Sequence, residues 1–113
     1  MAVYVSNLTI NTGATFSQTF SLENVTSNAA LDLNGFTASS QMRKHAGSTN
    51  VAATFTASIQ NADNGQVQVG LSSVTTATLK PGRYVYDVIV SDSVGEVTRV
   101  VEGSVLVRQG VTR

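Results

Sequence analysis

The stretch from Arg83 to Ser91 reads RYVYDVIVS, and it carries the strongest structural signal in the chain. Most of its positions are aromatic or β-branched, and these residue types fit a pleated strand. Because successive side chains of a strand point to opposite faces, every second residue shares one face. The residues on the face that we expect to be buried are Tyr84, Tyr86, Val88 and Val90.

The same alternation of apolar and Ser/Thr positions extends outward from this stretch through most of the chain. It predicts strands over residues 3–10, 14–22, 36–45, 51–60, 66–71, 83–91 and 96–108. Gln18 interrupts the apolar row of its segment, which predicts a strand near a sheet edge. Gly103 lies inside the longest run and predicts a bulge or bend there. The polar faces carry almost no charge, so an edge strand is poorly protected against pairing with another chain.

Turn-forming residues separate the predicted strands. The strongest signals are the Asn-Gly pairs at 34–35 and 64–65 and Pro81-Gly82, since Gly supplies positive φ and Pro presets φ near −65°. A further turn ends at Gly95. The exception to the strand pattern is the segment 72–79. There we expect one short helical turn capped by Ser73, with Ala77 and Leu79 packed beneath it.

These patterns predict an all-β protein, a two-sheet antiparallel β-sandwich of about seven to eight strands. A small barrel is the second choice. The length of 113 residues fits a single domain over residues 1–113. Within it, residues 1–10 are expected to form an N-terminal arm or edge strand, and residues 107–113 a C-terminal arm.

Composition excludes several classes of protein. The chain has no Cys, which rules out a disulfide scaffold, a thiolate metal site and a cysteine nucleophile. Seven Lys and Arg balance seven Asp and Glu, whereas nucleic-acid binders usually carry a basic excess. No apolar run is long enough for a membrane span, and the N-terminus does not resemble a signal peptide. We therefore expect neither a nucleic-acid nor a membrane partner.

No set of residues predicts catalysis. His45 is the only imidazole, and it follows Arg43 and Lys44 at a predicted strand end without a nucleophile motif nearby. The acids are scattered, mostly at turns. The segment 61–65 is similar to the start of a calcium loop, but Ser72 stands where such a loop needs a bidentate acid. We expect no enzyme, and no catalytic, cofactor-binding or metal-binding residue.

Asp87 is the most informative acid, because it lies inside the apolar strand, on the face opposite Tyr84 and Tyr86. A buried carboxylate needs a partner. Arg99 in the next strand is the favoured one, with Arg83 or a loop amide as alternatives, and Asp87→Ala is predicted to lower stability. The two tyrosines are expected to fill the core, and the alternative is a sugar-stacking platform.

The second half of the chain resembles a domain of tailed-bacteriophage virions. The similarity lies in TLKPGRYVYDV at residues 78–88, a glycine-centred hairpin, and EGSVLV at residues 102–107. The pattern is L-x-P-G-x-Y-x-Y-D-V. A weaker match covers LDLNGFTA at residues 31–38, and Arg43 stands where the pattern often has a basic residue.

This domain is similar to the N-terminal Ig-like part of phage baseplate upper proteins and tail-fibre or tail-spike adaptors. The resemblance implies an Ig-like sandwich in the virion that performs no catalysis. We expect it to bind other virion proteins as an oligomer or a multi-copy assembly, without a cofactor. We expect a small stand-alone component at the tail, baseplate or fibre base. The alternatives are a capsid decoration protein and a host-surface carbohydrate-binding module with a glycan partner. The residues expected to have structural roles are Pro81, Gly82, Tyr84, Tyr86, Asp87, Gly95, Arg99 and Gly103.

Overall fold

The computed structural model describes residues 4–24, 29–30 and 32–110. These residues form strands and one short helix, so the prediction of an all-β protein is confirmed. The elements are β1 (Tyr4–Val5), β2 (Leu8–Asn11), β3 (Phe16–Ser21), β4 (Glu23–Asn24), β5 (Ala29–Ala30), β6 (Thr37–Arg43), β7 (Ala53–Asn61), β8 (Gln66–Leu71), α1 (Ser73–Ala77), β9 (Gly82–Ser91) and β10 (Val97–Arg108).

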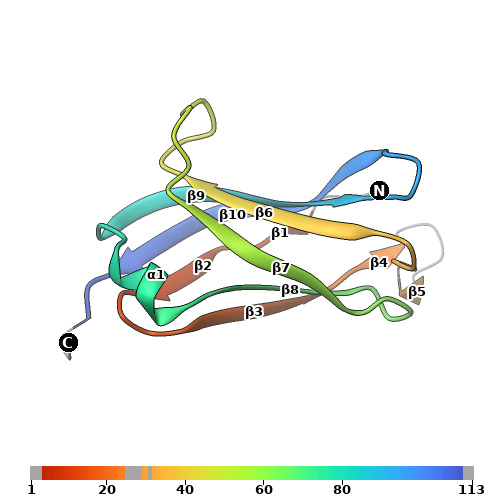
Figure 1. The fold of residues 1–113 in the computed structure, drawn as a ribbon, viewed down its shortest axis with the longest axis horizontal. Helices are drawn as coiled ribbons and strands as arrows, with labels where there is room; N and C mark the ends of the chain where they lie inside the picture. The colour runs from red at the N-terminus through yellow and green to blue at the C-terminus, as the bar shows by residue number, and fades with distance from the viewer. Residues whose placement is uncertain (1–3, 25–28, 31, 111–113) are drawn as a thin grey trace.

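The strands lie in two facing layers that share β7 (Figure 1). One layer holds β10, β9 and β6, with β1 and β2 both paired to β10 at its outer edge. The other holds β8 and β3. Residues 53–55 of β7 pair with β6, and residues 56–61 pair with β8. The hydrogen-bonded path therefore runs unbroken from one layer to the other, as in a partly open barrel.

The prediction of wholly antiparallel sheets is wrong at the N-terminus, because β1 and β2 run parallel to β10. One side of β10 is already bonded to β9, so the N-terminal segment takes the other side. The described part of the chain contains ten strands instead of about seven to eight. The excess comes from the two-residue strands β1, β4 and β5.

The interruption between β1 and β2 has a local cause at Gly103. A Cβ on this residue would overlap the carbonyl oxygen of Ser6. The amide and hydroxyl of Ser104 both donate to Asn7 Oδ1 at 3.1 Å. Residues 4–10 thus form an edge strand fixed to β10. Of the predicted C-terminal arm, Val107 and Arg108 belong to β10, and residues 111–113 lie outside the described residues.

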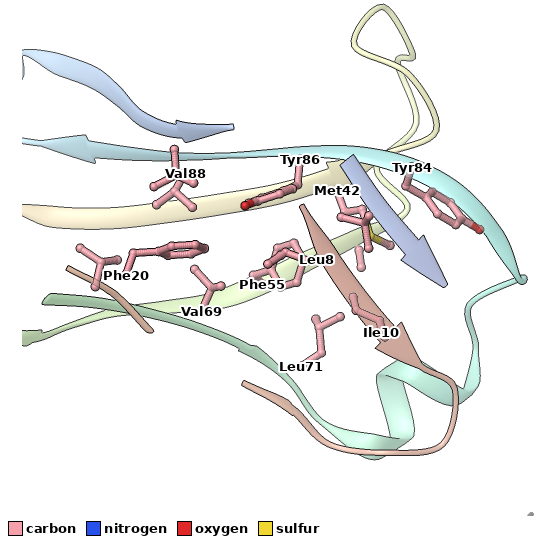
Figure 2. Packing of buried hydrophobic residues seen from close by; sticks show 14 of the residues in the cluster. Leu8, Ile10, Phe20, Met42, Phe55, Val69, Leu71, Tyr84, Tyr86 and Val88 are labelled. Atoms are coloured by element: carbon pink, nitrogen blue, oxygen red, sulfur yellow. The ribbon is translucent and has the colours of Figure 1, made fainter. Parts of the chain in front are cut away.

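The core fills the space between the layers (Figure 2). Phe55 of β7 lies near its centre, with its ring 5.9 Å from that of Phe16 and 6.1 Å from that of Tyr86. Leu8 and Ile10 of β2 are also buried, so the N-terminal strand contributes directly to the core. The remaining large core residues include Phe20, Leu22, Leu33, Met42, Val67, Val69, Leu71, Val88, Val90, Val105 and Val107.

Helix α1 differs in detail from its prediction. Its N-cap is Ser72 and not the predicted Ser73. The Ser72 hydroxyl accepts a hydrogen bond from Thr75 N. Leu79 is buried as predicted, but Ala77 is exposed and Thr76 is the residue that packs inward. The Thr76 hydroxyl donates to the Ala14 carbonyl at 2.8 Å, which joins the helix to the β2–β3 turn.

The irregularity in β10 also lies elsewhere than predicted. The register against β9 shifts between Arg99 and Val101, so the extra residue is Val100. Both Val100 and Val101 are buried, as expected when a bulge turns two consecutive side chains inward. Gly103 pairs regularly with Tyr86, and its small size serves the close approach of the N-terminal strand instead.

Candidate functional site

The outer face of the layer formed by β6, β9 and β10 carries several charged side chains that lie close together. On β9 the even-numbered residues 84–90 are buried, whereas Val85, Asp87 and Ile89 point outward and are half-buried. In the sheet register Asp87 lies between Gln41 on β6 and Glu102 on β10. The predicted alternation of this strand is confirmed, but Asp87 is not the buried carboxylate that we expected.

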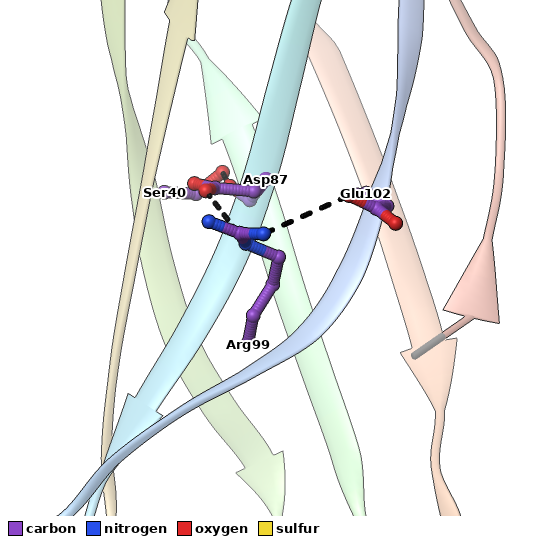
Figure 3. Close-up of polar contacts among 4 residues, drawn as sticks. All are labelled: Ser40, Asp87, Arg99 and Glu102. Carbon is purple, nitrogen blue, oxygen red and sulfur yellow. Dashed lines mark hydrogen bonds and ion pairs between the residues drawn. The ribbon is translucent and has the colours of Figure 1, made fainter. Parts of the chain in front are cut away.

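Arg99 pairs with two acids on this face (Figure 3). Its Nε lies 3.2 Å from Asp87 Oδ2, and its Nη1 lies 3.9 Å from Glu102 Oε2. The predicted partnership of Asp87 and Arg99 is confirmed. The bulge shifts the register so that Arg99 stands opposite Ile89, and the ion pair is therefore diagonal. The three side chains are 39–56% exposed, so water screens their attraction.

These residues line an open hollow of about 710 Å³. Apolar residues and charged residues both line it. The lining residues are Val5, Gln41, Arg43, Ala46, Val85, Tyr86, Asp87, Ile89, Arg99, Glu102 and Gly103. Arg43 is held in place by donating to the Ser48 carbonyl at 2.9 Å and to Gln41 Oε1 at 3.0 Å.

Tyr84 and Tyr86 lie on the inner face (Figure 2), so the alternative of a sugar-stacking platform is wrong for them. They are 8% and 4% exposed, and each hydroxyl is bound to the protein's own backbone. Tyr84 donates to the Lys80 carbonyl at 2.7 Å, and Tyr86 donates to the Ser6 carbonyl at 2.6 Å. Burial raises the pKa of Tyr86 to about 12.

Of the other predicted structural residues, Gly103 lies inside β10, whereas Pro81, Gly82 and Gly95 lie in or beside turns. Pro81 is at the bend between α1 and β9, and Gly82 begins β9 with a φ of 147°. Gly95 has a φ of 90° in the β9–β10 hairpin. Sequence reasoning missed Asp92, whose Oδ1 accepts from the amides of Val94 and Glu96 and closes this turn. The sequence signal for this turn is an acid, Asp92, two residues before Val94-Gly95, because an Asp side chain can accept from a backbone amide two residues later.

The remaining candidates for chemistry do not converge. His45 is exposed on the β6–β7 loop, which projects from the body of the molecule (Figure 1). Asp63 accepts a hydrogen bond from Asn34 Nδ2 at 2.7 Å, and the same amide nitrogen donates to Asp32. The Asn34 backbone amide lowers the pKa of Asp32 below its usual value. Among the described residues, no three His, Cys, Asp or Glu side chains gather as metal ligands would.

A second surface, on the opposite layer, is free of charge. The strands β3 and β8 and the part of β7 that pairs with β8 contain no Asp, Glu, Lys or Arg. Their outward side chains are hydroxyls and amides, such as Ser17 and Gln68, whose side chains hydrogen-bond at 2.8 Å. A smaller hollow of about 270 Å³ lies here, above Gly70.

Within residues 4–24, 29–30 and 32–110, no helix is long and apolar enough to cross a membrane.

Comparison with known proteins shows similarity at the level of the fold. No family model matches the chain, and no curated protein matches it. The solved structures that are similar to it include CopC and the GspB Siglec domain. CopC from Methylosinus trichosporium OB3b has a TM-score of 0.50 and 11% identity over 94% of this chain and 89% of its own. The GspB Siglec domain has a TM-score of 0.54 and 15% identity over 92% of this chain.

The chain spans about half, 54%, of the GspB structure that it matches. At these identities the similarity concerns the fold alone. It agrees with the all-β fold of two facing layers described above.

Proposed function

We propose that this chain is a non-enzymatic structural protein of a phage virion, which docks onto the tail, baseplate or fibre base by protein–protein contacts. The observation that supports this proposal most strongly is that Leu79, Tyr84, Tyr86 and Asp87, four of the specified residues of the L-x-P-G-x-Y-x-Y-D-V segment, are buried or bonded within the protein. Leu79 is buried, the two tyrosine hydroxyls bond to backbone carbonyls, and Asp87 pairs with Arg99. The segment thus builds a scaffold and leaves the outer face of β6, β9 and β10 for a partner.

The arrangement further supports an Ig-like assignment of the sandwich. In that fold a tyrosine near the start of a late strand bonds back to the backbone a few residues upstream. The bond from Tyr84 to Lys80 spans four residues and stands at the start of β9. Tyr86 follows two positions later, and its ring contacts that of Phe55 across the core, where antibody domains have a disulfide.

The proposal is tested on purified particles of the phage that encodes the chain. Mass spectrometry should detect the chain in the particles, and cryo-EM should place its density at the tail. A copy number that follows the capsid subunits would instead favour the alternative of a decoration protein. Particles that lack the chain altogether would overturn both.

A variant pair tests the docking face. Arg99→Glu reverses a charge that lines the hollow and is expected to reduce incorporation into particles. Arg108→Glu makes the same change at an exposed position that does not line the hollow, and should be incorporated normally. Equal incorporation of both variants would show that the partner binds elsewhere.

A further inference from the structure

The open edge of β3 lies on the layer opposite the proposed docking face. β3 pairs with β8 on one side, and the described residues provide no strand on its other side. Ser17, Gln18, Thr19 and Ser21 are exposed. The prediction from Gln18 that this strand lies at a sheet edge is therefore confirmed.

The backbone groups that face the open edge can be assigned from the neighbouring contacts. Leu22 N donates to the Gly65 carbonyl at 2.9 Å, and the Phe16 carbonyl lies against Gly70 of β8. In a strand, the amide and carbonyl of one residue point to the same side, and the side alternates along the chain. The even-numbered residues of β3 therefore bond to β8. The amides and carbonyls of Ser17, Thr19 and Ser21 point to the open edge.

Natural sheet edges are usually blocked by lysine, proline, a bulge or a covering segment. β3 has the sequence FSQTFS, with neither charge nor proline, and its register against β8 is regular. The Thr19 carbonyl at this edge accepts a hydrogen bond from the Gln18 side chain, whose Nε2 lies 3.4 Å away. That bond is long, and an incoming amide can replace it at little cost.

We infer that the β3 edge binds the β3 edge of a second copy of this chain, antiparallel, with a two-fold axis at Thr19. This axis places Thr19 opposite its counterpart and Ser17 opposite Ser21 of the other copy. All three edge-facing residues then form hydrogen-bonded pairs, and the paired outward side chains are hydroxyls, which interact favourably across strands. The pairing is isologous, so one surface serves both copies.

The absence of charge on this face favours a second copy of the chain as the binding partner of the β3 edge. The outer face of β3, β8 and the adjoining part of β7 carries no charge, and the formal net charge of the chain is zero. Two copies that approach by this edge meet no like-charge repulsion. The dimer would join the two charge-free faces into one continuous sheet and leave both hollows on the β6, β9 and β10 layers accessible. The inference does not depend on the phage role.

The test is analytical ultracentrifugation of the full chain over a wide concentration range. The unmodified chain is expected to change from monomer to dimer as its concentration rises. Thr19→Lys places two like charges directly opposite each other and should abolish the dimer, as should Thr19→Glu. Ser58→Lys is the matched control, because Ser58 lies in the same outward row, two strands away, and should dimerise normally.

An equimolar mixture of Thr19→Lys and Thr19→Glu tests the register itself. Because residue 19 faces its own counterpart, the mixture should recover a heterodimer that neither variant forms alone. Circular dichroism of each variant checks that it remains folded. A chain that stays monomeric at every concentration, a Thr19→Lys variant that still dimerises, or a mixture that stays monomeric would overturn the inference.

Discussion

Gly103 shows how a single residue controls the path of the N-terminal strand. A Cβ there would overlap the Ser6 carbonyl and approach Asn7 Oδ1 at 3.2 Å, so Gly103→Ala must push the N-terminal strand away from β10. We expect a loss of about 1–3 kcal/mol in the free energy of unfolding, the usual cost of overpacking. Urea unfolding measures it. Gly47→Ala is the control, since its Cβ would lie 3.8 Å from His45 and should change little.

The buried hydroxyl of Tyr86 predicts a dependence of stability on alkaline pH. Its pKa rises from 10.0 to about 12 on folding, so the native state holds the proton more tightly than the unfolded state. The stabilisation is fully present below about pH 10 and is lost as the pH rises toward 12. In Tyr86→Phe this loss should be absent. Unfolding curves of both proteins across this range measure the difference, and parallel declines would contradict the assignment.

The ion pair of Asp87 and Arg99 should contribute less than its place in an apolar strand suggests. Both side chains are substantially exposed, and exposed pairs contribute about 0–1 kcal/mol. Asp87→Ala is therefore expected to lower the free energy of unfolding by no more than about 1 kcal/mol. A double-mutant cycle with Arg99→Ala measures the coupling. A coupling well above this value would show that the pair is less hydrated than its exposure indicates.

At the scale of elements, β2 is part of the core although it lies at an edge. Ile10 is fully buried between the layers, whereas its neighbour Thr9 is exposed. Ile10→Ala should cost about 2–5 kcal/mol, as other large-to-small core changes do, and Thr9→Ala should be nearly neutral. Thermal unfolding of the two variants compares them. Equal stability would mean that the N-terminal segment is an arm that leaves the core intact.

The elements also show what the sequence could predict and what it could not. Alternation located β8 at residues 66–71, and β9 within one residue, because a half-buried strand must repeat every two positions. The parallel pairing of β2 was not predictable, since alternation is the same for either direction. The ion-pair partners could be proposed from sequence, but their diagonal register involves the bulge at Val100, which has no Gly or Pro signal.

At the scale of the whole molecule, the two layers are expected to unfold together. β7 belongs to both, because its first residues pair with β6 and its later ones with β8. Phe55 lies at this crossing, with its ring near those of Phe16 and Tyr86 from the two layers. If either layer unfolded, Phe55 would be exposed and its packing against the other layer would be lost. This favours a single cooperative unfolding transition.

Phe55→Ala tests this coupling. The substitution should cost about 3–5 kcal/mol through the cavity that it leaves. Both far-UV circular dichroism, which reports the strands, and near-UV circular dichroism, which reports the tyrosines, should shift to the same lower midpoint. Ala57→Gly changes the same strand two positions later and should have a smaller effect on both midpoints. Separate midpoints for the two signals in the Phe55 variant would show that the layers unfold independently, and that β7 does not couple them.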